Sequence, residues 1–148
     1  MAKIFSFIRF LGSSIVFPLI WTIIIICLLC IPGKALPGMG IFGIKNLDKL
    51  VHIFLFGSFV TFWSVYAWKG RTSYLNWLVK LALIVFLSIA IGVVMEYVQR
   101  DYIPNRSFDV WDIWADAVGS LLTMYLLWKY GRRWQLLRDE VEAKNKPL

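Results

Sequence analysis

Acidic, basic and amide side chains recur at helical spacing in three separate parts of this sequence. Within each part most neighbours are three or four residues apart, which places them on one face of an α-helix. We interpret these residues as one candidate ligand-binding set, provided that the three faces meet. The set is Asp48, Lys49, His52, Glu96, Gln99, Arg106, Asp109, Asp112 and Asp116.

Several chemistries are open to such a set. His52, Glu96 and Asp116 could transfer protons, because carboxyl groups in different environments can act separately as acid and base. Arg106 could hold a phosphate or a carboxylate through two parallel hydrogen bonds. A divalent cation held by Glu96, Asp112 and Asp116 is a further option, since carboxylate oxygens bind such ions. The spacing alone does not choose among these chemistries.

Each residue also has a purely structural interpretation. Asp48 could cap a helix, and His52 could be a hydrogen-bonded histidine in a packed interior. Glu96 could extend its carboxylate toward the membrane surface. The helix dipole favours acids in a first turn and so accounts for Asp109. It does not account for Asp116, which would lie about 13 Å along a helix that begins near position 107.

Four apolar stretches surround these residues and would have to position them. The chain is 59% hydrophobic with a mean hydropathy of +0.69, far more apolar than a soluble domain. A helix needs about 20 apolar residues to cross a membrane. The sequence therefore predicts an all-α integral membrane bundle, with residues 1–148 as a single membrane domain. Its four transmembrane helices are expected at about 11–31, 50–68, 80–99 and 108–130.

The distribution of lysine and arginine predicts how these helices are oriented. Eleven basic residues precede the first stretch, separate the second from the third, or follow the fourth, and five lie on the other side. Basic residues in short loops favour the cytoplasm. Both termini are therefore expected there, with residues 131–148 as a basic cytoplasmic tail and the polar set on the extracytoplasmic side. The net charge of +7 follows this pattern, and we expect no nucleic-acid partner.

Three short motifs lie between positions 46 and 119. They are Asp48-Lys49-x-x-His52, Glu96-x-x-Gln99, and Arg106-Ser107-x-x-x-x-Asp112-x-x-x-Asp116-x-x-Gly119. In these motifs the segment resembles the VanZ-like family of small bacterial membrane proteins. The elements occur in family order and cover about half of the chain. In the family pattern asparagine usually stands where this chain has Asp116, so this chain carries an additional carboxylate there.

The resemblance implies a multi-pass protein of the bacterial inner membrane. The founding member is associated with teicoplanin resistance, and the family has no assigned reaction. We expect a polar pocket at the extracytoplasmic face that binds a cell-envelope amphiphile or a partner and influences glycopeptide susceptibility. The alternative is a membrane-embedded enzyme acting on a lipid-linked or phosphate-bearing envelope substrate. Expected partners are membrane lipids, an envelope lipid or glycopeptide-related ligand, and a protein partner or second copy; the sequence assigns no cofactor.

Overall fold

A computed structural model describes residues 14–32, 47–68 and 73–144. Within these ranges the chain folds into four α-helices and forms no strand, so the predicted all-α class is confirmed. The helices are α2 (Val16–Leu29), α3 (Leu47–Ala67), α4 (Tyr74–Tyr102) and α5 (Val110–Lys144).

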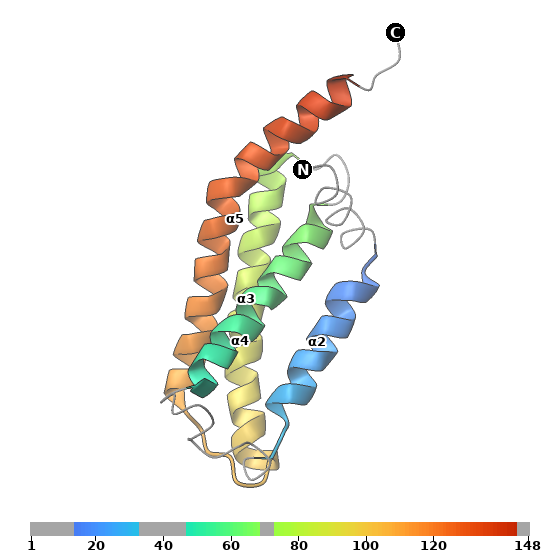
Figure 1. Ribbon diagram of the computed structural model, residues 1–148. Helices are drawn as coiled ribbons and strands as arrows, with labels where there is room; N and C mark the ends of the chain where they lie inside the picture. Colours follow the sequence, from blue (N-terminus) through green and yellow to red (C-terminus); the bar gives the residue numbers. More distant parts are fainter. Residues whose placement is uncertain (1–13, 33–46, 69–72, 145–148) are drawn as a thin grey trace.

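Successive helices run in alternating directions along one bundle (Figure 1). α3 and α4 both pack against α5, and α2 lies mainly against α3. As a result, the start of α3, the end of α4 and the start of α5 lie at one end of the bundle, together with the end of α2. The start of α2 and the end of α5 lie toward the other end. The segments that carry the polar set are thus brought to one end of the molecule.

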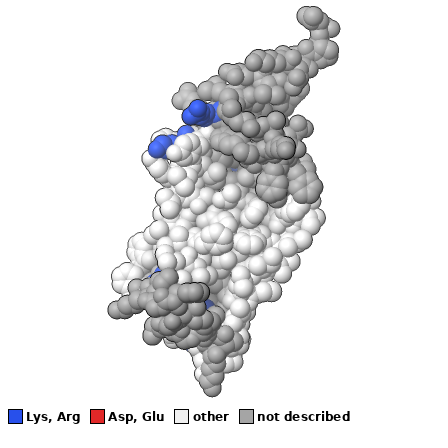
Figure 2. Space-filling model, in the orientation of Figure 1, with Lys and Arg blue, Asp and Glu red and all other residues white. Residues whose placement is uncertain are grey.

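Three helices are long and apolar enough to cross a membrane, in the ranges Leu47–Ala67, Tyr74–Tyr102 and Val110–Gly131. Their outward faces carry large apolar side chains, such as Phe54, Leu83 and Phe86, that are more than half exposed. The middle of the face seen in Figure 2 has no charged side chain. Such a surface is typical of contact with lipid.

α2 differs from the other helices in length. Its 14 residues would extend about 21 Å, which is shorter than the roughly 30 Å hydrocarbon core of a bilayer. The helix predicted at 11–31 begins in a part of the chain outside the described residues. Three of the described helices are therefore long and apolar enough to span a membrane. The described part of α2 is too short to span it by itself.

α3 begins at Leu47, three residues before the expected position, and the starts of α4 and α5 differ from expectation for local reasons. α4 begins at Tyr74, because the Ser73 hydroxyl accepts a hydrogen bond from the backbone N–H of Asn76 and caps the helix. α5 was expected to begin near position 107. Instead Asp109 Oδ1 accepts the Trp111 N–H at 2.8 Å, and α5 begins at Val110. α5 also continues to Lys144, through the segment expected to be a tail.

A close contact between α3 and α5 aligns the polar ends of these helices. A Cβ atom on Gly119 would overlap the backbone carbonyl of Ile53, so only glycine allows the two backbones to approach this closely. Ile53 is the neighbour of His52 in the chain. The contact therefore places the His52 side chain beside the first turns of α5.

Candidate functional site

The polar residues meet at the end of the bundle where α3 and α5 begin and α4 ends. Four side chains there are almost completely buried: His52 is 4% exposed, Glu96 1%, Asp112 5% and Asp116 1%. We call these four residues the histidine cluster. A second group, the lysine cluster, consists of Lys49 with Asp48, Asp109 and Asp112. Asp112 belongs to both groups and connects them.

Lys49 holds the lysine cluster together. Its Nζ lies 2.9 Å from Asp48 Oδ2, 2.8 Å from Asp109 Oδ2 and 2.7 Å from Asp112 Oδ1. Asp48 and Asp109 are partly exposed, whereas Asp112 is buried. The hydrogen bond from Lys49 lowers the pKa of Asp109 below its ordinary value. One ammonium group thus binds three carboxylates from two helices.

His52 occupies the centre of the histidine cluster. Its Nδ1 lies 2.8 Å from Asp116 Oδ1, and its Nε2 lies 3.8 Å from Asp112 Oδ2. The Phe56 ring stacks on the imidazole with a 9° interplanar angle and a 6.4 Å centroid distance. Because Phe56 and Asp116 restrain the ring, Nε2 faces the carboxylate of Asp112.

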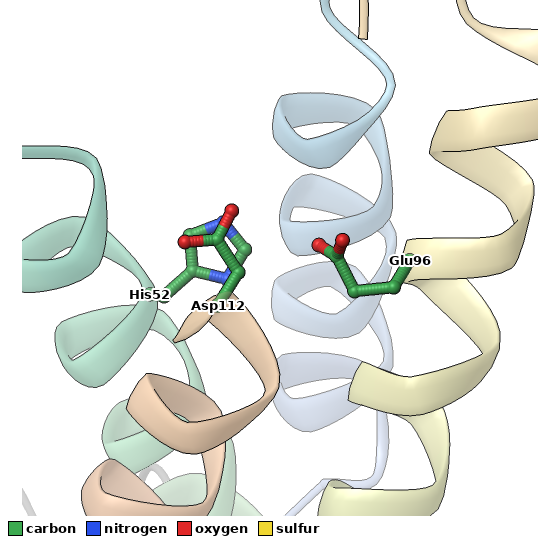
Figure 3. Close-up of side chains that lie close together, drawn as sticks. All are labelled: His52, Glu96 and Asp112. Atoms are coloured by element: carbon green, nitrogen blue, oxygen red, sulfur yellow. The ribbon is translucent and has the colours of Figure 1, made fainter. Parts of the chain in front are cut away.

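Glu96 enters the cluster from α4. Figure 3 shows its carboxylate directed toward His52 and Asp112 from the opposite side. Glu96 Oε2 accepts the backbone N–H of Asp109 at 2.9 Å, which ties the end of α4 to the start of α5. One ligand atom from each of His52, Glu96 and Asp112 lies within 4.8 Å of the others. These three side chains are therefore close enough to share an ion.

Small residues make room for Asp116 between α4 and α5. A Cβ atom on Gly92 would lie 2.5 Å from Asp116 Oδ2, so the carboxylate occupies space that only glycine leaves free. Ser88 Oγ and Ser120 Oγ are 2.9 Å apart, and the Ser120 hydroxyl donates to the Asp116 carbonyl. Ser120 was not among the candidate residues predicted from the sequence. Its position four residues after Asp116 is the signal that could have identified it.

Gln99 and Arg106 do not belong to either cluster. Gln99 is buried, and its Nε2 donates to the Leu29 carbonyl at 2.8 Å, which joins α4 to the end of α2. Arg106 is half-buried, and its Nε is buried without a hydrogen-bond partner. Within the described part of the chain Arg106 forms no ion pair. The structure thus brings together seven of the nine candidate residues, and the other two have different surroundings.

The side chains of the two clusters contact one another directly, and those of the histidine cluster are almost completely buried. Two hollows of about 320 and 220 Å³ lie elsewhere, on apolar surfaces of the bundle, and Trp63 and Ile84 line both. Because of its burial, the histidine cluster could bind only a small ligand, whereas the partly exposed Asp48 and Asp109 could contact a larger one.

The two clusters carry an excess of negative groups. They contain five carboxylates, from Asp48, Glu96, Asp109, Asp112 and Asp116, against the basic side chains of Lys49 and His52. Even a protonated His52 would leave more acidic than basic groups. Buried carboxylates are stable only when protons or cations compensate them. The arrangement is therefore suited to binding a cation or to transferring protons.

No family model, curated protein or solved structure matches this chain. The function of the site is therefore inferred from its own residues and geometry.

Proposed function

We propose that this chain is a VanZ-like protein of the bacterial inner membrane that crosses the membrane four times with both termini in the cytoplasm. Two observations support this topology. The start of α2 and the end of α5 lie toward the same end of the bundle (Figure 1). The eleven basic residues assigned to that side outnumber the five on the other side. The two polar clusters then lie at the extracytoplasmic face.

At that face the protein binds the headgroup of a cell-envelope amphiphile and thereby influences susceptibility to teicoplanin-type glycopeptides. The observation that carries this proposal is Arg106, whose buried Nε has no hydrogen-bond partner among the described residues. A buried donor without a partner is costly, and a guanidinium matches the geometry of a phosphate or carboxylate. An anionic headgroup would supply the missing acceptor.

Aromatic side chains at the end of α4 and just before α5, the part of the chain that includes Arg106, suit a ligand with one polar and one apolar end. Tyr97 and Phe108 form an exposed aromatic pair with ring centroids 5.3 Å apart, and Tyr102 is largely exposed. Aromatic side chains of this kind are enriched where a membrane meets water. The headgroup of an amphiphile could contact Arg106 while its chains remain along the apolar helices.

Arg106→Ala tests this function, with Arg100→Ala as the matched control. Arg100 belongs to the same end of the bundle, but it is exposed and paired with Asp101. Both variants would be expressed in a bacterial host, and membrane abundance would be measured beside teicoplanin susceptibility. Arg106→Ala should accumulate normally and lose the effect on susceptibility, as should Glu96→Gln, whereas Arg100→Ala should keep it. Loss of the Arg106 variant from the membrane, or full activity of this variant, would contradict the proposal.

A second candidate function is catalysis on a lipid-linked or phosphate-bearing envelope substrate. The specific observation in its favour is the buried pair of His52 and Asp116. A histidine oriented by a carboxylate is a common general base, and Nε2 of His52 is directed away from Asp116. Incubation of the purified protein with envelope lipids, followed by mass spectrometry, separates the two candidates. Conversion that His52→Gln abolishes would favour the enzyme, and saturable binding without conversion would favour the binding protein.

A further inference from the structure

Two groups of side chains in the described residues are close enough to hold a metal ion. They differ in whether a lysine ammonium group already lies among their carboxylates. The carboxylates of Asp48, Asp109 and Asp112 already surround the ammonium group of Lys49 at hydrogen-bond distance. The other group consists of His52, Glu96 and Asp112. No lysine or arginine among the described residues forms an ion pair with Glu96 or with the Asp112 oxygen that faces His52. The second group therefore lacks the cation that the first one has.

The orientation of His52 indicates what the second group could bind. Asp116 lies at hydrogen-bond distance from Nδ1, and a proton on Nδ1 would leave the lone pair of Nε2 free. Although His52 is almost completely buried, its Nε2 has no hydrogen-bond partner among the described residues. The 3.8 Å to Asp112 Oδ2 is too long for a hydrogen bond. Within this almost completely buried side chain, Nε2 thus has no hydrogen-bond partner and lies 3.8 Å from Asp112, in the group that also includes Glu96.

We propose that His52 Nε2 and the carboxylates of Glu96 and Asp112 bind one divalent transition-metal ion of the Zn²⁺ type. One imidazole with two carboxylates suits Zn²⁺ better than Mg²⁺ or Ca²⁺, which favour oxygen ligands alone. Ligand atoms around zinc are about 3.4 Å apart in a tetrahedral site with bonds near 2.1 Å. The three ligand atoms here lie within 4.8 Å of one another, so small side-chain rotations would close the site.

Partners outside the metal site hold each of the three ligands in place. Asp116 orients His52, Lys49 binds the other oxygen of Asp112, and the Asp109 N–H binds Glu96 Oε2. Contacts of this kind fix the ligands of metal sites and raise metal affinity. The ion would also compensate two buried carboxylates. Three protein ligands leave a fourth position open for water or an anionic group.

Metal binding to the purified full-length chain tests this proposal independently of any effect on glycopeptides. The protein in detergent micelles would be stripped with a chelator and titrated with Zn²⁺ by calorimetry, and we expect one ion per chain. Asp116→Asn should weaken binding about 10- to 100-fold, as expected for a partner outside the metal site. His52→Gln and Glu96→Gln should weaken binding further. Asp101→Asn is the matched control, because Asp101 is exposed and pairs with Arg100, and its affinity should not change.

A cobalt titration of the unmodified chain gives a readout that needs no variant. Co²⁺ in a nitrogen–oxygen site of low coordination number should produce visible absorption bands, which added Zn²⁺ should remove. Gel filtration would show which variants remain folded. Failure of the unmodified chain to bind Zn²⁺, the absence of cobalt bands, or equal Zn²⁺ affinity in folded His52→Gln and the unmodified protein would each overturn the proposal.

Discussion

Nδ1 of His52 lies 2.8 Å from Oδ1 of Asp116, although the two residues are 64 positions apart in the sequence. Both side chains are almost completely buried, and they come from α3 and α5. The contact depends on the close packing of these helices at Gly119 and on the space left by Gly92. A change in this contact would therefore affect both the packing of the bundle and the geometry of the site.

Substitutions of Asp116 should show whether the pair with His52 needs a hydrogen-bond acceptor or a negative charge at this position. Asp116→Ala leaves a buried nitrogen of His52 without its partner, and we expect the free energy of unfolding to fall by about 1–3 kcal/mol. Asp116→Asn should lose much less, because its amide oxygen can still accept a hydrogen bond from Nδ1. Denaturant titration in detergent, followed by tryptophan fluorescence, measures both values. Equal losses would mean that the charge, not the hydrogen bond, stabilises the pair.

Gly92→Ala should displace Asp116 from His52. The added Cβ would lie 2.5 Å from Asp116 Oδ2, closer than a real Cβ atom approaches, so the carboxylate must move. Overpacking of this kind costs about 1–3 kcal/mol of unfolding free energy. Val94→Ala, at an exposed position of the same helix, is the control and should have little effect.

The double variant Gly92→Ala/Asp116→Ala tests the cause of this loss. Without the carboxylate the closest contact becomes the one to the Asp116 Cβ at 3.1 Å, so the cost of the Gly92 substitution should shrink. An unchanged cost would show that the clash with Asp116 is not the reason.

The ion pair of Lys49 and Asp109 should make stability depend on pH in the acidic range. In the folded protein, hydrogen bonding to Lys49 lowers the pKa of Asp109 below its ordinary value of 3.8. The unfolded chain therefore binds this proton more tightly, and the contribution of Asp109 is present above pH 3.8 and lost as the pH falls through the folded pKa.

Asp109→Asn is the variant that isolates this effect. Its amide oxygen can still accept the Trp111 N–H, but it no longer forms an ion pair with Lys49. The difference in unfolding free energy between the unmodified protein and this variant should be largest near neutral pH and shrink below pH 3.8. A difference that stays constant across this range would contradict the proposed origin.

Cysteine labelling should determine the orientation of the bundle. Single cysteines would be introduced at Gly40, Ile103, Thr72 and Glu140 in a chain whose Cys27 and Cys30 have been replaced by serine. A membrane-impermeant reagent applied to intact cells should label positions 40 and 103, and positions 72 and 140 only after permeabilisation, because the basic-rich side is expected in the cytoplasm. The reverse pattern would place both polar clusters in the cytoplasm.

The fold class and the polar face of each helix could be predicted from the amino-acid sequence, because both depend on local patterns. Apolar length predicts the membrane helices, and spacings of three or four residues place Asp112 beside Asp116 within a single helix. These relationships hold whatever the neighbouring helices do. The sequence was therefore sufficient to predict that polar faces from three helices could act together.

The pairing of residues between helices could not be predicted in this way, because spacing within a helix does not define the rotation or axial offset between helices. The glycine contact between α3 and α5 sets that offset, and it directs Asp116 to the far side of His52. The sequence suggested Glu96, Asp112 and Asp116 as metal ligands, whereas His52 stands with Glu96 and Asp112 in the structure. Packing between helices likewise separated Gln99, which binds the end of α2, from the clusters that its sequence position had suggested.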